Sequence, residues 1–108
     1  MEKPVVDPKR TVAVVCTNEA WPEDGYTSPG SVFIDNEKVY KDHLLFACPG
    51  CGLMGSIPIS PPPKQDHSWM VVSGDPLKPE TLTLAPSIDC VGCCKWHGHL
   101  VDGLFKSC

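Results

Sequence analysis

The sequence has few aromatic residues, no long apolar run and no strongly basic segment. Phe, Trp and Tyr together make up 7% of its 108 residues. No apolar stretch approaches the length needed to cross a bilayer. Residues 1–20 lack the basic start, apolar run and small-residue cleavage site of a secretory signal. We therefore expect a cytoplasmic protein with no membrane partner.

The charge balance argues against a nucleic-acid-binding protein. The formal net charge is −4, and Lys and Arg do not gather in one part of the chain. Proteins that follow a phosphate backbone draw much of their affinity from clustered basic residues. We therefore do not expect a nucleic-acid partner, and a nucleic-acid-binding zinc ribbon is kept only as an alternative.

Turn-forming residues and cysteines, by contrast, are abundant. Twelve prolines and nine glycines favour short strands joined by turns over long helices. Seven cysteines are an odd number, which does not suit a closed disulfide framework, and in a reducing compartment paired cysteines point to a metal. The sequence predicts one all-β domain over residues 1–108, a small zinc-stabilised antiparallel fold with zinc-ribbon-like hairpins and little helix.

The order of the expected elements follows from apolar and β-branched runs between turn signals. Residues 1–10 read as an extended N-terminal arm and residues 17–30 as a surface loop. Cys16 is expected to pack as a small apolar residue within the first strand. A two-residue Asp102-Gly103 turn predicts a hairpin near the end of the chain. The expected strands are 11–16, 31–34, 43–48, 53–59, 69–73, 81–88, 97–101 and 104–106.

The first half of a metal site is the segment Cys48-Pro49-Gly50-Cys51-Gly52. Two cysteines two residues apart, followed by Pro and Gly, form a tight knuckle whose N–H groups can point at the sulfurs, as in structural zinc sites. The flanking strands 43–48 and 53–59 can pair antiparallel. Cys48 and Cys51 are therefore predicted ligands of one structural Zn²⁺ at the tip of a hairpin.

The second half of the site has several candidate ligands near the C-terminal end of the chain. Cys90 with Cys93 would complete a four-cysteine site. Cys94 with His97 would complete a mixed site, and Cys108 could replace Cys94 if the last hairpin folds back. The remaining thiols and His99 could also hold a second ion. Spacing alone leaves these alternatives open.

A resemblance to a known group of proteins bears on this choice. Trp69, Gly74-Asp75, Pro79, Thr81 and Ala85-Pro86-Ser87-Ile88, followed by Cys94-x-x-His97-Gly98 and Asp102-Gly103, resemble small uncharacterised phage and bacterial proteins. Those proteins carry a CPxCG knuckle and a Cys/His…DG tail, and some are labelled ammonia monooxygenase. The likeness covers about residues 45–108. It implies a compact zinc-binding β fold without an established activity, and it favours His97 as a ligand, giving the set Cys48, Cys51, Cys94 and His97.

These observations favour a protein-interaction factor over an enzyme. Four protein ligands leave a zinc ion no open position for water or substrate, and no catalytic residues are predicted. The leading hypothesis is a phage-encoded accessory protein that binds and inhibits a host or phage protein, with a host enzyme as the possible partner. A zinc-dependent hydrolase is the alternative; its site would use His97, His99 and a thiolate, with Asp89 or Asp102 as base. Thioredoxin-like dithiol chemistry would require a βαβ pattern, and none is visible.

Overall fold

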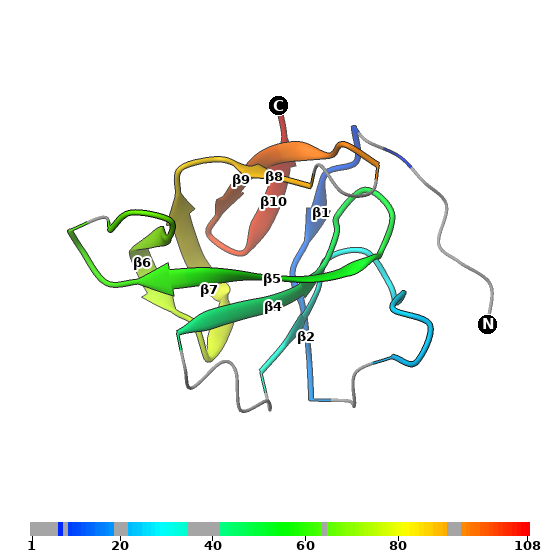
Figure 1. Ribbon diagram of the computed structural model, residues 1–108, viewed down its shortest axis with the longest axis horizontal. Helices are drawn as coiled ribbons and strands as arrows, with labels where there is room; N and C mark the ends of the chain where they lie inside the picture. Colours follow the sequence, from blue (N-terminus) through cyan, green and yellow to red (C-terminus); the bar gives the residue numbers. More distant parts are fainter. Residues whose placement is uncertain (1–6, 8, 19–21, 35–41, 64, 91–93) are drawn as a thin grey trace.

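The chain forms two β sheets in a computed structural model that describes residues 7, 9–18, 22–34, 42–63, 65–90 and 94–108 (Figure 1). No helix occurs in these ranges, so the expected all-β class is confirmed. The smaller sheet has the order β1-β10-β9-β8 and the larger one β2-β3-β4-β5-β6-β7. The smaller sheet consists of β1 (Val12–Ala13), β8 (Ile88–Asp89), β9 (His97–Val101) and β10 (Leu104–Ser107). The larger one consists of β2 (Val15–Thr17), β3 (Ser31–Phe33), β4 (His43–Ala47), β5 (Met54–Ser60), β6 (Trp69–Asp75) and β7 (Lys78–Ala85).

The larger sheet contains the hairpin that carries the cysteine knuckle. β4 and β5 pair antiparallel from His43 opposite Pro58 to Ala47 opposite Met54, which confirms the predicted pairing. The sheet is mixed, because β2 runs parallel to β3 and β5 runs parallel to β6. Gly52 has a φ of 82°, a left-handed conformation that glycine adopts without steric cost. The chain can therefore reverse direction directly after Cys51.

The smaller sheet is built around the predicted C-terminal hairpin. β9 and β10 pair antiparallel on either side of Asp102 and Gly103. These two residues have φ values of 47° and 74°, as the favoured two-residue hairpin turn requires. β8 pairs with the other edge of β9. The short strand β8 therefore forms the edge of this sheet, next to β9 of the hairpin.

The core lies between the two sheets. Alternation along β7 buries Leu82 and Leu84, as expected from the Thr-Leu pattern. Phe105 of β10 stacks on Phe46 of β4 with 5.6 Å between ring centroids, and Trp96 meets Phe105 edge-on at 6.0 Å. The other buried members of this cluster include Val32, Leu44, Ile59, Ile88 and Leu100. These contacts join the knuckle hairpin to the C-terminal strands.

Two sequence expectations change or stay open. Cys16 is exposed on β2 and its thiol donates a hydrogen bond to the Glu80 carboxylate at 3.0 Å, so the expectation that it packs as an apolar residue was wrong. The N-terminal arm and the loop 17–30 include residues 1–6, 8 and 19–21, which lie outside the described part of the chain. In the described part, no helix has the length and apolar character needed to cross a membrane.

Candidate functional site

Three cysteines from two distant parts of the chain meet at the tip of the β4–β5 hairpin. Their ligand atoms (Cys48, Cys51 and Cys94) all lie within 4.8 Å of one another, and the Sγ atoms of Cys48 and Cys94 are 3.6 Å apart. The Gly50 N–H donates to the Cys48 sulfur at 3.4 Å, which is the knuckle geometry expected from the Cys-Pro-Gly-Cys spacing. None of these three cysteines forms a disulfide with another described cysteine. They form a candidate metal site.

The thiol pKa values show what this crowding does chemically. The pKa of Cys48 is raised far above its ordinary value, first by hydrogen bonding with the Cys90 thiol and then by burial. Burial raises the pKa of Cys94 to about 11, and the neighbouring Cys48 adds to the effect. Because several thiolates cannot share this space without a compensating cation, the donor set fits a thiophilic ion such as Zn²⁺, which would replace the protons.

The candidate residues for the fourth ligand differ in their surroundings. The contact with Cys48 brings Cys90 beside the cluster, whereas Cys93 lies outside the described residues. Cys108 is exposed, with its sulfur 3.6 Å from Nδ1 of His99. His97 as a ligand stays a prediction. In this structure its Nε2 contacts the Ser87 hydroxyl instead.

Ser87 and His97 form a hydrogen-bonded pair, with the Ser87 Oγ 2.9 Å from Nε2 of His97. Ser87 immediately precedes β8, and His97 is the first residue of β9. The two strands pair antiparallel, with Ile88 opposite Gly98. Ile88 and Gly98 face the core, so alternation places Ser87 and His97 on the outer face. The result is a serine hydroxyl and an imidazole hydrogen-bonded to each other at a solvent-accessible surface.

Asp89 lies next to this pair. It is the cross-strand partner of His97. The Cys90 N–H donates to the Trp96 carbonyl, so the Asp89–His97 pair falls between hydrogen-bonded pairs, where side chains of antiparallel strands approach most closely. The outer face therefore presents a hydroxyl, an imidazole and a carboxylate together.

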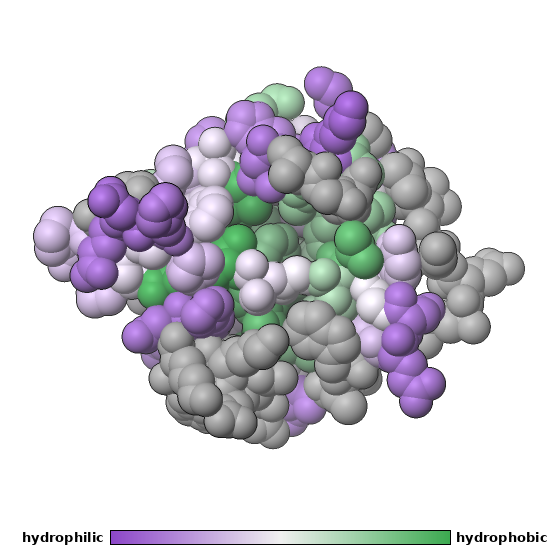
Figure 2. All heavy atoms as spheres, viewed as in Figure 1, coloured by the Kyte–Doolittle hydropathy of each residue, from purple (hydrophilic) through white to green (hydrophobic). Residues whose placement is uncertain are grey.

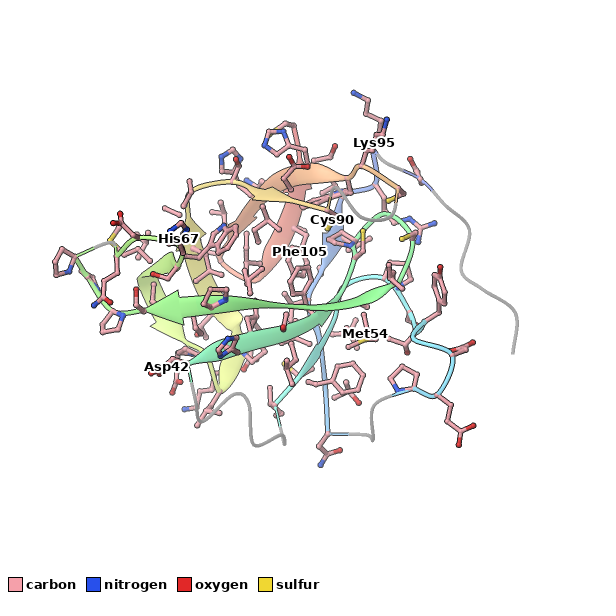
Figure 3. The ribbon with its side chains drawn as sticks, viewed as in Figure 1. Asp42, Met54, His67, Cys90, Lys95 and Phe105 are labelled. Atoms are coloured by element: carbon pink, nitrogen blue, oxygen red, sulfur yellow. The ribbon has the colours of Figure 1, made fainter. Side chains whose placement is uncertain are left out.

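The cysteine cluster and the serine–histidine pair share one segment of chain. Cys90 directly follows β8, and Cys94 to Trp96 lead into β9. The Lys95 N–H donates to the Cys90 carbonyl at 3.2 Å, and the buried Trp96 indole donates to the Arg10 carbonyl at 2.6 Å. Figure 3 shows Cys90 and Lys95 at one end of the paired strands β8 and β9. A metal bound by the cysteines would thus fix the strand ends that carry the pair.

Sequence reasoning gave Ser87 no role, although a signal was present. Ser87 lies in the Ala85-Pro86-Ser87-Ile88 motif and His97 in the Cys94-x-x-His97-Gly98 motif, both of which carried the resemblance. The ten-residue separation of Ser87 and His97 does not indicate a contact by itself, because the contact depends on the pairing of β8 with β9. A hydroxyl that hydrogen-bonds an imidazole can act as a nucleophile whose proton the imidazole takes.

A comparison with known families covers most of the chain. The model of a family described as the bacterial ubiquitination-like system serine protease, BubE, matches residues 17–108. No match was found among curated proteins or solved structures. The matched region contains both the cysteine cluster and the serine–histidine pair. The chain belongs to the BubE family.

Proposed function

We propose that this BubE-family chain is a serine protease of a bacterial ubiquitination-like system, with Ser87 as the nucleophile and His97 as the general base. The observation that carries the proposal is the 2.9 Å separation of Ser87 Oγ and His97 Nε2 on an exposed face. That distance lies within the range over which a base can take a proton from a hydroxyl. The description of the family supplies the biological setting.

The reaction would proceed by acyl transfer. With its proton on Nδ1, His97 accepts the Ser87 hydroxyl proton at Nε2 as Oγ attacks the carbonyl carbon of the substrate. The new Oγ–C bond forms, the C–N bond of the substrate breaks, and the proton on Nε2 passes to the leaving amine. Water then attacks the acyl-enzyme with His97 again as base. The products are a carboxylate, an amine and free enzyme.

Neighbouring groups would orient the pair. Asp89 is the cross-strand partner of His97, and a negative charge at this position would stabilise the imidazolium that forms during attack. The Trp69 indole donates to the Ser87 carbonyl at 3.1 Å, which holds the backbone at the nucleophile. Asp89 and Trp69 are therefore assigned positioning roles.

Zinc would have a structural role in this scheme. Cys48, Cys51 and Cys94 would hold the ion, with Cys90 beside them, and such a closed thiolate site has no open coordination position for chemistry. Its contribution is to tie the knuckle to the segment between β8 and β9. This separates the proposal from a zinc-dependent hydrolase, in which the metal itself would polarise the substrate.

An inhibitory interaction factor remains a distinct second hypothesis. Binding a partner does not require a reactive hydroxyl. The exposed hydrogen bond between Ser87 and His97 is the feature that favours the protease. The two hypotheses predict opposite results for a variant that lacks only the Ser87 oxygen.

A fluorophosphonate probe, which forms a covalent bond with activated serines, tests the proposal. We expect intact mass spectrometry to find one label on the zinc-loaded protein, at Ser87 by peptide mapping. Ser87→Ala and His97→Ala should lose labelling, and Ser73→Ala, which changes an exposed serine on β6, should keep it. Cleavage of a ubiquitin-like protein of such a system, extended beyond its C-terminus, should fall at least about 10³-fold in Ser87→Ala.

Two results would contradict the protease proposal. Cleavage that persists in a folded Ser87→Ala variant but stops on metal removal would favour a zinc hydrolase. If the protein neither labels nor cleaves, and Ser87→Ala still binds a partner as the unmodified chain does, the interaction hypothesis takes precedence.

A further inference from the structure

A hollow of about 210 Å³ lies between the larger sheet and β8, and its lining includes Ile88, the residue that follows Ser87. Its walls are Met54 to Ile57 of β5 on one side and Ile88 to Cys90 on the other, and Phe46 and Leu53 add apolar surface. In Figure 1, β8 lies on the side of β5 that is opposite to β4. Figure 2 shows hydrophobic surface exposed near the middle of this face, with hydrophilic residues around it. The hollow is thus apolar and open to solvent.

The absence of a side chain at Gly55 creates this space. Gly55 is opposite the buried Phe46 in the β4–β5 register, so it faces the core side of the sheet together with Leu53 and Ile57, which pack against the core. A Cβ built on Gly55 meets no atom within 4 Å. The flanking residues on this face, Leu53 and Ile57, carry bulky side chains, whereas position 55 leaves room for an additional group.

Both walls present backbone groups that pair with no strand among the described residues. The Cys48 N–H donates to the Leu53 carbonyl, so alternation directs the Ser56 N–H and carbonyl away from β4. On the other wall, the Cys90 N–H donates to Trp96, so the Asp89 N–H and carbonyl point away from β9. These groups match the requirements of an extended peptide, which binds to open sheet edges through its main chain.

We propose that the groove between β5 and β8 binds the substrate as an extended strand and that the space above Gly55 accepts one apolar substrate side chain. The inference rests on the protease function proposed for Ser87 and deepens it. Because a strand advances about 3.3 Å per residue, the pocket beside residues 88–90 lies about two residues from the bond at Ser87. The site would select a polypeptide that is unfolded near the cleaved bond and carries an apolar residue at that distance.

Filling the pocket tests this inference. Gly55→Leu should fold, because its Cβ meets open space and its φ needs no glycine, while its side chain occupies the pocket. A peptide library with one apolar residue placed at each position around the cleaved bond should show a preference at one position in the unmodified protein. In Gly55→Leu, we expect kcat/KM for the preferred peptide to fall at least about tenfold.

Two controls separate failure of the inference from failure of the proposed function. Fluorophosphonate labelling of Ser87 in the unmodified protein reports the nucleophile without an extended peptide. Ser73→Leu adds the same side chain to an exposed position on β6 and should leave the peptide preference unchanged. Labelling with no positional preference, or with a preference that Gly55→Leu retains, would overturn the groove assignment alone. Absence of labelling in the unmodified protein would overturn the protease function and with it the groove.

Discussion

Cys94 and His97 lie three positions apart, yet the thiol of Cys94 faces the cysteine cluster and the imidazole of His97 faces Ser87. The turn at Lys95, with a φ of 64°, and the buried Trp96 separate them. One short segment therefore contributes to two sites with different chemistry.

The fourth metal ligand can be identified by native mass spectrometry of single variants. We expect Cys48→Ser, Cys51→Ser, Cys94→Ser and Cys90→Ser to lose the bound ion, because each thiol is part of the cluster or contacts it. His97→Ala should retain one ion, because its Nε2 is engaged with Ser87. The reverse result, with metal lost from a folded His97→Ala and kept by Cys90→Ser, would establish the mixed site that the sequence favoured.

Removing the metal should reduce the reactivity of Ser87 without removing the residue. Among the described thiols, Cys90 and Cys94 connect the segment between β8 and β9 to the knuckle. Without the metal this segment would be less restrained, and the hydrogen bond between Ser87 and His97 would loosen. We expect a chelator to lower the fluorophosphonate labelling rate at least about tenfold, and added Zn²⁺ to restore it. A labelling rate that is unchanged in protein shown to be metal-free would contradict this coupling.

Trp96→Phe should destabilise the fold by about 2–4 kcal/mol. The indole is fully buried, meets the Phe105 ring edge-on and donates to the Arg10 carbonyl. Phe fills less of this space and cannot donate. Urea denaturation of the zinc-loaded protein measures the change, and Trp69→Phe, at a half-buried site, serves as a comparison. A difference below about 1 kcal/mol would show that the site repacks.

Much of the fold could be predicted from local patterns. The Thr-Leu alternation in β7, the Asp102-Gly103 turn and the apolar runs around the knuckle each specify structure within a few residues, and all three are confirmed. Cys48 and Cys51 were predicted from their own spacing, and Cys94 was favoured with the help of the resemblance. Local patterns act where the interacting residues are near in sequence.

The serine–histidine pair could not be found this way because it depends on pairing between distant residues. Ser87 ends a Pro-containing run and His97 follows a cysteine-rich segment, and neither lies in a recognised catalytic motif. Their contact requires β8 to lie beside β9 in one register, with Ile88 opposite Gly98. A shift of one residue would turn Ser87 toward the core. The same limit explains Cys16, which an apolar run suggested was buried and whose partner Glu80 is far along the chain.

The Cys16–Glu80 contact makes a prediction about titration. The thiol donates to the carboxylate and holds the pKa of Glu80 below its usual value. Because the folded pKa is depressed, any stability from this contact is present above the unfolded pKa of Glu80 and is lost as the pH falls through the folded value. Cys16→Ala should raise the pKa of Glu80, measured by NMR of its side-chain carbon. A Glu80 titration that Cys16→Ala leaves unchanged would show that the hydrogen bond is not formed in solution.

Gly98→Ala should disturb the serine–histidine pair by displacing strand β9. A Cβ at Gly98 would lie 2.7 Å from two atoms of the Trp96 ring and would also meet the Lys106 carbonyl. The Lys106 carbonyl belongs to the backbone of β10 and cannot rotate away, so β9 must shift relative to β8 and β10. Because Gly98 directly follows His97 and is opposite Ile88, that shift would move the imidazole relative to Ser87.

We therefore expect Gly98→Ala to lower the free energy of unfolding by about 2–3 kcal/mol, measured by urea denaturation, and to slow fluorophosphonate labelling in the fraction that remains folded. Gly55→Ala is the matched control, since its Cβ enters open space and the same glycine-to-alanine change should leave stability and labelling nearly unaltered. Equal behaviour of the two variants would mean that the close approach of β9 to Trp96 and Lys106 does not determine where His97 lies.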